Sequence, residues 1–454
     1  MATVPQTPMT LEQALEYSSG QIADAFQRYV NPGLYGLLQL IGADRHFVKA
    51  EGTVVTDEDG RECLDFLGGY GVLNLGHNHP EVEAAVERVA SLPNILQASL
   101  GLLSAPLAEA LAAITPGALQ HTFFANSGTE AVEGALKIAR KATGRPGFLH
   151  AEGSFHGKSL GSLSVTGRRK YQLPFEPLVP GCSAVPYGDA DALERELATG
   201  GYAAFIVEPV QGEGGIVVPP DGYLKAAEEA CHRHRSLFIA DEIQTGFGRT
   251  GDLFAVEHDG AEPDIMVLAK ALGGGVMPAA AFISTAAVWN AAYGTRDTCL
   301  LHTSTFGGNT RACAAVLKVI EVVLRDDLAG QARAKGEWLL GELRGLQADS
   351  KLVKEVRGRG LMIGVEFYEP KVAKGLSNEY LAASVAGLLL QRHDIITAYT
   401  LNNPNVMRLE PPLTVTREEL ERMVGALGEV MGRHRGFASV VGRLGVEAIL
   451  RRLH

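Results

Sequence analysis

Three short runs of apolar residues, each leading into a charged side chain, constrain this chain most. Residues 203–207 run into Glu208, residues 237–240 run into Asp241, and residues 265–268 are followed, one residue later, by Lys270. Short continuous apolar runs are typical of strands that are buried on both faces of a parallel sheet. The carboxyl ends of such strands meet at one edge of the sheet, and ligands bind there. The sequence therefore predicts a site that brings these three side chains together.

A carboxylate and a lysine in one enclosed site indicate a particular chemistry. Asp241 can hold a proton on a pyridinium nitrogen, and a lysine whose pKa is lowered by apolar surroundings can form a Schiff base. Pyridoxal phosphate (PLP) is the cofactor that needs both groups. For Lys270 a surface position before a flexible turn remains the alternative. For Asp241 the alternatives are a helix N-cap and a metal ligand, but no histidine lies at ligand spacing nearby and we predict no metal site.

A phosphate site is predicted where an apolar run ends and a helical pattern begins. Residues 123–125 lead directly into Ser127, Gly128 and Thr129, which would form the first turn of that helix. Free backbone N–H groups and the helix dipole attract anions to such a turn, and the glycine permits a close approach. A plain serine or threonine N-cap remains the alternative.

The order of elements predicts an α/β protein with a large and a small part. With 454 residues the chain exceeds one ordinary core. From about residue 104 to 330 helical stretches alternate with short apolar runs, as in a wound parallel sheet. We assign residues 1–75 to an N-terminal segment of the small domain, 76–335 to the large cofactor domain, and 336–454 to the C-terminal small domain.

The two ends of the chain carry their own local signals. One or two helices are expected before Asn31-Pro32-Gly33, which stops the helical pattern. Residues 48–66 predict a hairpin with an Asp59-Gly60 turn. Residues 353–356 and 362–367 predict strands, residues 381–393 and 418–433 predict helices, and residues 436–454 predict an amphipathic helical tail.

Composition excludes several classes of partner. The net charge of −11 argues against nucleic acid, because phosphate backbones attract basic surfaces. No run of about 18 apolar residues predicts a membrane span. The five scattered cysteines show no Cys-x-x-Cys spacing, and the N-terminus has no signal-peptide pattern, so we expect a cytoplasmic protein with reduced thiols.

Competing motifs are weaker. Gly157-Lys-Ser159-Leu-Gly161 matches the nucleophile elbow of hydrolases, but that motif needs a strand running straight into the glycine, and residues 152–156 intervene. The histidine pairs at 77 and 79 and at 232 and 234 lie in a turn and on a helix, with spacing that disfavours zinc.

Seven motifs in order make the chain resemble the class III PLP-dependent aminotransferases of fold type I. The stretches that carry the resemblance are 126–131 (NSGTEA), 155–157 (FHG), 208–215 (EPVQGEGG), 241–246 (DEIQTG), 270–275 (KALGGG), 305–309 (TFGGN) and 408–413 (RLEPPL). The resemblance implies a large domain with a mostly parallel seven-stranded sheet flanked by helices. It also implies a small α+β domain built from both chain ends.

The resemblance also implies roles around the cofactor. Lys270 would form the Schiff base and then move a proton between the substrate Cα and the cofactor C4′, while Asp241 would pair with the pyridinium. The other implied cofactor contacts are the phosphate residues Ser127, Gly128 and Thr129, the ring-stacking Phe155 with its neighbour His156, the nearby carboxylate Glu208, the ring-oxygen contact Gln244, and Thr305. Thr305 would reach the phosphate in the other subunit, so a homodimer with shared sites is expected.

Three further positions concern the substrate. Arg408 matches the arginine that binds an α-carboxylate, and Glu213 matches the glutamate that pairs with it when the substrate end is uncharged or cationic. A permanent structural ion pair is the alternative. Lys158 stands where ornithine and acetylornithine aminotransferases usually carry an arginine, and lysine lacks the planar fork. Several stretches look most like the putrescine (diamine) aminotransferases.

The resemblance therefore predicts transfer of an amino group from a terminal amine, such as putrescine, to 2-oxoglutarate or pyruvate by ping-pong kinetics. Ornithine or acetylornithine aminotransferase activity is the next alternative. A PLP-dependent amino-acid racemase or epimerase keeps the cofactor but returns the proton to Cα. A hydrolase that uses Ser159 is the alternative from another class.

Overall fold

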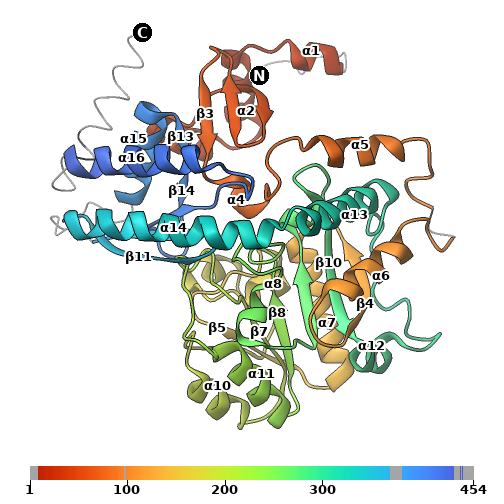
Figure 1. Ribbon diagram of the computed structural model, residues 1–454. Helices are drawn as coiled ribbons and strands as arrows, with labels where there is room; N and C mark the ends of the chain where they lie inside the picture. Colours follow the sequence, from red (N-terminus) through yellow and green to blue (C-terminus); the bar gives the residue numbers. More distant parts are fainter. Residues whose placement is uncertain (1–8, 97–98, 369–380, 434–439, 441, 443–454) are drawn as a thin grey trace.

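The large part of the protein is built on a seven-stranded sheet. The computed structural model describes residues 9–96, 99–368, 381–433, 440 and 442 (Figure 1). In sheet order the strands are β4 (Leu119–Ala125), β10 (Ala280–Thr285), β9 (Ile265–Leu268), β8 (Leu237–Asp241), β7 (Tyr202–Val207), β5 (Gly147–Ala151) and β6 (Cys182–Val185). Strand β10 runs antiparallel to both of its neighbours, and the remaining pairs from β9 to β6 are parallel. The predicted mostly parallel seven-stranded sheet is confirmed.

Helices cover both faces of this sheet because its strands are apolar on both sides. In β7 the side chains of Phe205 and Val207 join one core cluster, and those of Ala204 and Ile206 join another. The first cluster includes residues of α6 (Ser104–Ile114), α10 (Ala190–Leu197), α11 (Tyr223–Arg233) and α13 (Thr310–Arg325). The second includes residues of α7 (Gly128–Thr143) and α12 (Ala286–Tyr293). The alternation of a strand thus places the sheet between two helical layers.

The small part combines both ends of the chain. Strands β1 (Phe47–Glu51), β2 (Val54–Asp57) and β3 (Glu62–Asp65) form a sheet with β13 (Ile395–Ile396), which pairs in parallel with β3. A second sheet has the order β11 (Val353–Arg359), β12 (Met362–Phe367), β15 (Val406–Leu409) and β14 (Ala398–Tyr399). Helices α14 (Leu328–Asp349) and α15 (Leu381–His393) pack against this second sheet, and α16 (Arg417–Arg433) packs against both of these helices (Figure 1). The hairpin of β2 and β3 and the contribution of both chain ends agree with the sequence predictions.

The remaining helices of the described chain are short, and several turns accompany them. Helices α1 (Leu11–Leu15), α2 (Ser19–Tyr29) and α3 (Pro32–Ile41) precede β1, and α5 (Pro80–Arg88) packs against α13. The short turn α4 (Gly68–Gly71) lies between β3 and α5 in the chain. Helices α8 (Leu160–Ser164) and α9 (Arg169–Gln172) follow β5. Turns of 3-10 type cover Leu173–Phe175, Ala255–Asp259 and Lys270–Gly273.

Two expectations about the ends need correction. Asn31-Pro32-Gly33 ends α2 as expected, but it also begins α3, because the Asn31 side chain caps that helix and Pro32 occupies its first position. The proposed domain boundary at 335/336 lies inside α14, so a single continuous helix joins the two parts there. The domain division otherwise remains a proposal, and the tail predicted for residues 436–454 lies almost entirely outside the described residues.

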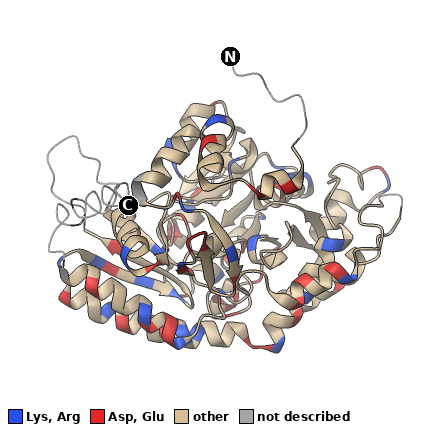
Figure 2. Cartoon of the chain, turned by 90° about the horizontal axis from the view of Figure 1, so that it is seen from above, with Lys and Arg blue, Asp and Glu red and all other residues tan. Residues whose placement is uncertain are grey.

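Acidic and basic residues are mixed along the helices at the outside of the fold (Figure 2). Among the described residues, none of the helices combines the length and the apolar character needed to cross a bilayer.

Candidate active site

A cavity of about 510 Å³ lies at the carboxyl edge of the large sheet. Its walls come from segments that directly follow β4, β5, β7, β8 and β9, together with the segment that enters β10. Among the predicted site residues, those that line it are Ser127, Gly128, Thr129, Phe155, His156, Glu208, Glu213, Asp241, Gln244 and Lys270. Residues more than 100 positions apart in the chain thus meet because parallel strands end at the same edge.

The start of α7 forms one wall of this cavity. Ser127 caps the helix in a reciprocal capping box with Glu130, and this leaves the backbone amides of Gly128 and Thr129 without intrahelical partners. A side chain at position 128 would come within 2.9 Å of Ile243, so only glycine fits without displacing it. The Thr129 hydroxyl lies 2.7 Å from the hydroxyls of Ser159 and Ser162. The turn therefore presents free N–H donors to an anion.

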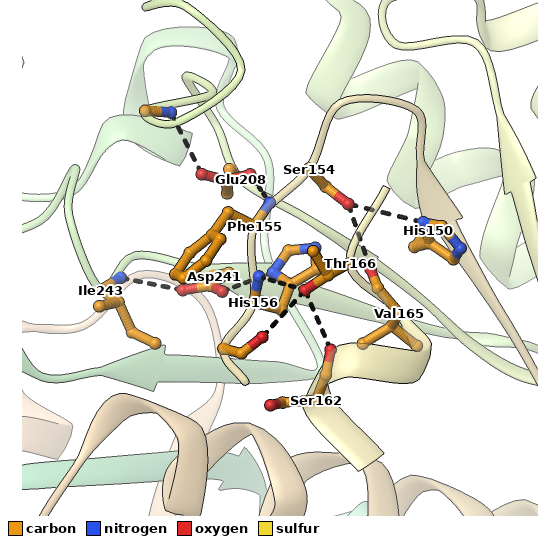
Figure 3. Close-up of polar contacts among 12 residues, drawn as sticks. His150, Ser154, Phe155, His156, Ser162, Val165, Thr166, Glu208, Asp241 and Ile243 are labelled. Atoms are coloured by element: carbon orange, nitrogen blue, oxygen red, sulfur yellow. Dashed lines mark hydrogen bonds and ion pairs between the residues drawn. The ribbon is translucent and has the colours of Figure 1, made fainter. Parts of the chain in front are cut away.

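Asp241 ends β8 and has a buried histidine as its partner. Its Oδ2 lies 2.6 Å from Nδ1 of His156, and its Oδ1 accepts a hydrogen bond from the Ile243 amide at 3.1 Å (Figure 3). Both side chains are buried, and Nε2 of His156 has no hydrogen-bond partner among the described residues. The Asp241 carboxylate is thus fixed in orientation at the cavity wall.

Glu208, directly after β7, is held by two backbone amides. It accepts hydrogen bonds from the amides of Phe155 at 2.9 Å and Gly212 at 3.1 Å (Figure 3). Burial raises the pKa of Glu208 to about 7, and the nearby Asp241 carboxylate acts in the same direction. Glu208 thereby fixes the backbone that carries Phe155 and binds the loop that leads to Glu213.

Lys270 has an unusual backbone conformation. Its φ of 47° lies in the left-handed region, which costs a residue with a side chain about 1 kcal/mol or more. The side chain stays partly open to the cavity, and burial by the surrounding protein lowers its pKa. A lysine that loses its charge readily, on a strained turn just after β9, is suited to act as a nucleophilic amine.

Gln244 connects the cavity to the turn α4. Its side-chain amide donates a hydrogen bond to the carbonyl of Tyr70 at 3.0 Å. Tyr70 has a φ of 61°, and its ring lies 5.1 Å from the Arg408 guanidinium. The turn of Gly68–Gly71 thus holds two of the predicted site residues together.

Arg408, in β15, carries two carboxylate partners. Its Nη2 lies 2.6 Å from Oε2 of Glu213, and its Nη1 lies 3.2 Å from Oε2 of Glu410. Arg408 and Glu410 are completely buried, whereas Glu213 lines the cavity. Burial, the largest single effect, would raise the pKa of Glu213, but Arg408, the Leu401 amide and Lys270 together lower the pKa below its ordinary value, so Glu213 is a carboxylate. Arg408 therefore lies behind Glu213, as expected for a pair that a substrate could open.

Lys158, Ser159 and Thr305 lie outside the lining of this cavity. The Lys158 ammonium lies 5.9 Å from the ring centre of Phe155 and 5.0 Å from that of Tyr171, within cation–π range. The Ser159 hydroxyl donates to a carboxylate, Glu133, at 2.6 Å and not to a histidine, which argues against the hydrolase alternative. Thr305 lines a separate hollow together with residues 93–96 and 99–102.

A model of the family described as aminotransferase class III matches residues 42–431. The chain belongs to the class III aminotransferase family. It is 44% identical over 431 residues to the putrescine aminotransferase of Pectobacterium atrosepticum, an alignment that covers 92% of this chain and 89% of that protein. The predicted family and its PLP-dependent transaminase chemistry are thereby confirmed.

Solved structures support the same assignment. The ornithine aminotransferase of Toxoplasma gondii is similar with a TM-score of 0.83 and 31% identity, and the match covers 97% of this chain and 100% of that one. An amine transaminase from an uncultivated Pseudomonas species, in its PLP-bound form, is similar with a TM-score of 0.79 and 30% identity, over 88% of this chain and 95% of that one. Both likenesses extend through the large and the small parts.

The cavity of this class III aminotransferase fits PLP on its own geometry. The amides at the start of α7 suit the phosphate, the oriented Asp241 carboxylate suits a protonated ring nitrogen, and Lys270 brings an amine to the same cavity. Phe155 and Gln244 line the same cavity, where an aromatic face and a side-chain amide suit a flat, polar ring. PLP is the cofactor of this enzyme.

Sequence reasoning missed three features of the site. His156 was expected near the cofactor, but its pairing with Asp241 across 85 positions was not foreseen. Tyr70 and Glu410 were not singled out at all. A signal for Glu410 existed, because residues two apart on a strand share a face, so position 410 follows Arg408 onto the same side.

Proposed function

We propose that this class III aminotransferase takes an amino group from a terminal amine of a diamine, with putrescine as the model donor, and transfers it to a 2-oxo acid such as 2-oxoglutarate or pyruvate. One observation carries the donor assignment: the Glu213 carboxylate occupies Arg408 and faces the cavity. An ammonium group is attracted to that carboxylate, whereas a substrate α-carboxylate would have to displace it. The 44% identity to a putrescine aminotransferase supports the proposal.

The roles proposed for the site residues follow from their positions. PLP, when bound, supplies an electron sink that stabilises a carbanion next to nitrogen. Lys270, with its lowered pKa, moves a proton to and from the substrate carbon, and the Asp241–His156 pair holds the proton on the ring nitrogen. Ser127, Gly128 and Thr129 bind the phosphate, Phe155 and Gln244 position the ring, and Glu208 fixes the backbone of Phe155.

The second half of the reaction requires a carboxylate to bind. We propose that Glu213 turns away from Arg408 when the 2-oxo acid enters, so that one pocket serves a cationic and an anionic substrate in turn. Lys158, at 5.9 Å from the Phe155 ring, is proposed to contribute positive charge near the entrance. Ornithine is a second candidate donor, because a movable Glu213 would also admit its α-carboxylate.

We further propose a homodimer in the cytoplasm in which Thr305 completes the partner's phosphate site. Large apolar side chains are exposed in the segments beside Thr305, among them Leu100, Leu102, Leu300 and Phe306. Exposed apolar side chains that gather on neighbouring segments are typical of a protein–protein interface. Sedimentation analysis of the wild type and of Thr305→Ala, together with the phosphate affinity of the apoenzyme, would test this assignment.

A donor screen tests the main proposal. The yellow enzyme is mixed with single amines in the absence of a 2-oxo acid, and bleaching reports the first half-reaction. We expect bleaching by putrescine and related diamines, restored by 2-oxoglutarate or pyruvate. Bleaching by ornithine or N-acetylornithine with no response to any diamine would refute the donor assignment, and loss of optical rotation of an amino acid without any 2-oxo acid would point to a racemase.

A further inference from the structure

Arg408 is held by two carboxylates that differ in where they lie. Glu213 contacts Nη2 at 2.6 Å and faces the cavity, whereas Glu410 contacts Nη1 at 3.2 Å and is completely buried. Arg408 thus faces two carboxylates at once, and the buried guanidinium of Arg249 also interacts with the charge of Glu410. Glu410 is also the strongest of the charged groups that raise the pKa of Lys270, against the larger opposite effect of burial.

The positions of Glu213 and Glu410 around the Arg408 guanidinium determine which of the two an incoming substrate carboxylate can replace. Nε and Nη2 lie on the same edge of an arginine and form the fork that binds a carboxylate through two hydrogen bonds. In Arg408, neither Nε nor Nη2 makes a hydrogen bond of good geometry among the described residues, and the ion pair with Glu213 is formed at Nη2. The Nε–Nη2 edge is therefore available to an incoming carboxylate once Glu213 leaves. Glu410 occupies the remaining nitrogen, Nη1, and does not compete for that edge.

The position of Glu410 in the fold prevents a similar movement. It follows β15 directly, and its amide donates a hydrogen bond to the carbonyl of Phe66 at 2.8 Å. The turn α4 packs against it so closely that a side chain at Gly68 would lie 2.4 Å from the Glu410 carbonyl oxygen. Its side chain also lies 3.5 Å from the Gln244 amide. With its backbone tied to two elements and its side chain fully buried, Glu410 stays on Arg408 when Glu213 moves.

We propose that Glu410 is a specificity-determining residue, which keeps one carboxylate on Arg408 in both half-reactions and thereby sets the balance between cationic and anionic substrate ends. While Glu213 is in place, the two carboxylates on Arg408 favour the distal ammonium of a diamine. When Glu213 has moved, Glu410 still offsets the charge of Arg408, so a carboxylate binds well enough to react but not tightly. This inference rests on the proposed function and adds the residue that tunes its substrate class.

The test compares Glu410→Gln with the wild-type holoenzyme and with Glu418→Gln, the same chemical change at an exposed position on α16. Two quantities are measured: the Kd of glutarate, a dicarboxylate that cannot react, and the ratio of kcat/KM for putrescine to that for ornithine. In Glu410→Gln we expect glutarate to bind about ten-fold more tightly and the ratio to fall about ten-fold, because one buried charge is removed from beside Arg408. Glu418→Gln should match the wild type in both.

The outcomes separate this inference from the proposed function. An unchanged glutarate Kd in folded, PLP-loaded Glu410→Gln, or an equal fall in kcat/KM for all substrates, would overturn the role of Glu410. Should Glu410→Gln fail to fold, Glu410→Asp is measured instead, because it keeps the charge but withdraws it from Nη1 of Arg408. We expect the glutarate Kd and the kcat/KM ratio to change in the same direction but by less. No change in either quantity would overturn the inference. A wild-type enzyme that uses no diamine would refute the proposed donor and leave the glutarate comparison valid.

Discussion

The pairing of His156 with Asp241 allows a quantitative prediction. The side chain of His156 is completely buried, and its Nδ1 lies 2.6 Å from the Asp241 carboxylate. Among the described residues, the Ile243 amide at 3.1 Å is the other hydrogen-bond donor to that carboxylate. Replacing His156 with leucine would leave a buried carboxylate with one donor. Replacing it with asparagine would keep an N–H donor close to the position of Nδ1.

The expected magnitude follows from the loss of one hydrogen bond to a charged group. Such bonds contribute about 1.5–3 kcal/mol, and each 1.4 kcal/mol corresponds to about a ten-fold change in an equilibrium or rate constant. If Asp241 is no longer oriented toward the ring nitrogen, both PLP affinity and kcat should fall by about ten- to a hundred-fold in His156→Leu. In His156→Asn the loss should stay below about ten-fold, because the donor is retained.

The assay titrates PLP into each apoenzyme and measures the rate of bleaching by a saturating amine. Thermal melting of each apoenzyme serves as the control for folding. The reasoning would be refuted if the leucine and asparagine variants lost PLP affinity equally, because the shape of the ring and not its hydrogen bond would then matter. It would also be refuted if His156→Leu bound PLP and reacted like the wild type.

Two further predictions concern Lys270 and Glu242. Borohydride reduction of the PLP-loaded enzyme should leave the cofactor fixed on the peptide that contains Lys270. Peptide mapping that finds the cofactor on another peptide would contradict the assignment of Lys270. The variant Lys270→Ala should lose about a thousand-fold or more of the transamination rate. Burial raises the pKa of Glu242 to about 7, so between pH 4.5 and 7 the unfolded chain releases a proton that the folded protein keeps. As the pH rises through that window, the wild type should lose up to about 3 kcal/mol of unfolding free energy relative to Glu242→Gln. Urea denaturation of both proteins measures this difference, and an identical pH dependence of their unfolding free energies would contradict the prediction.

Much of the fold was predictable because its signals are local. Strands β7, β8 and β9 are short apolar runs, and α15 has the bounds predicted for a helix over residues 381–393. The predicted stop at Asn31-Pro32-Gly33 was incomplete for a local reason too, since the same residues that end one helix are favourable at the start of the next. The domain boundary within α14 could not be placed, because a helix that spans two parts has no break in its own sequence.

The sequence by itself determined the sheet, the lysine and aspartate at its carboxyl edge, and the family to which they belong, because each of these depends on residues that are neighbours along the chain. Only the tertiary structure decided which partners these groups have. His156 reaches Asp241, and the Tyr70 ring reaches Arg408, through contacts between different strands and loops. Electrostatic interactions in a buried site depend on distance and orientation in space, to within an ångström or so, and spacing along a chain does not set either quantity.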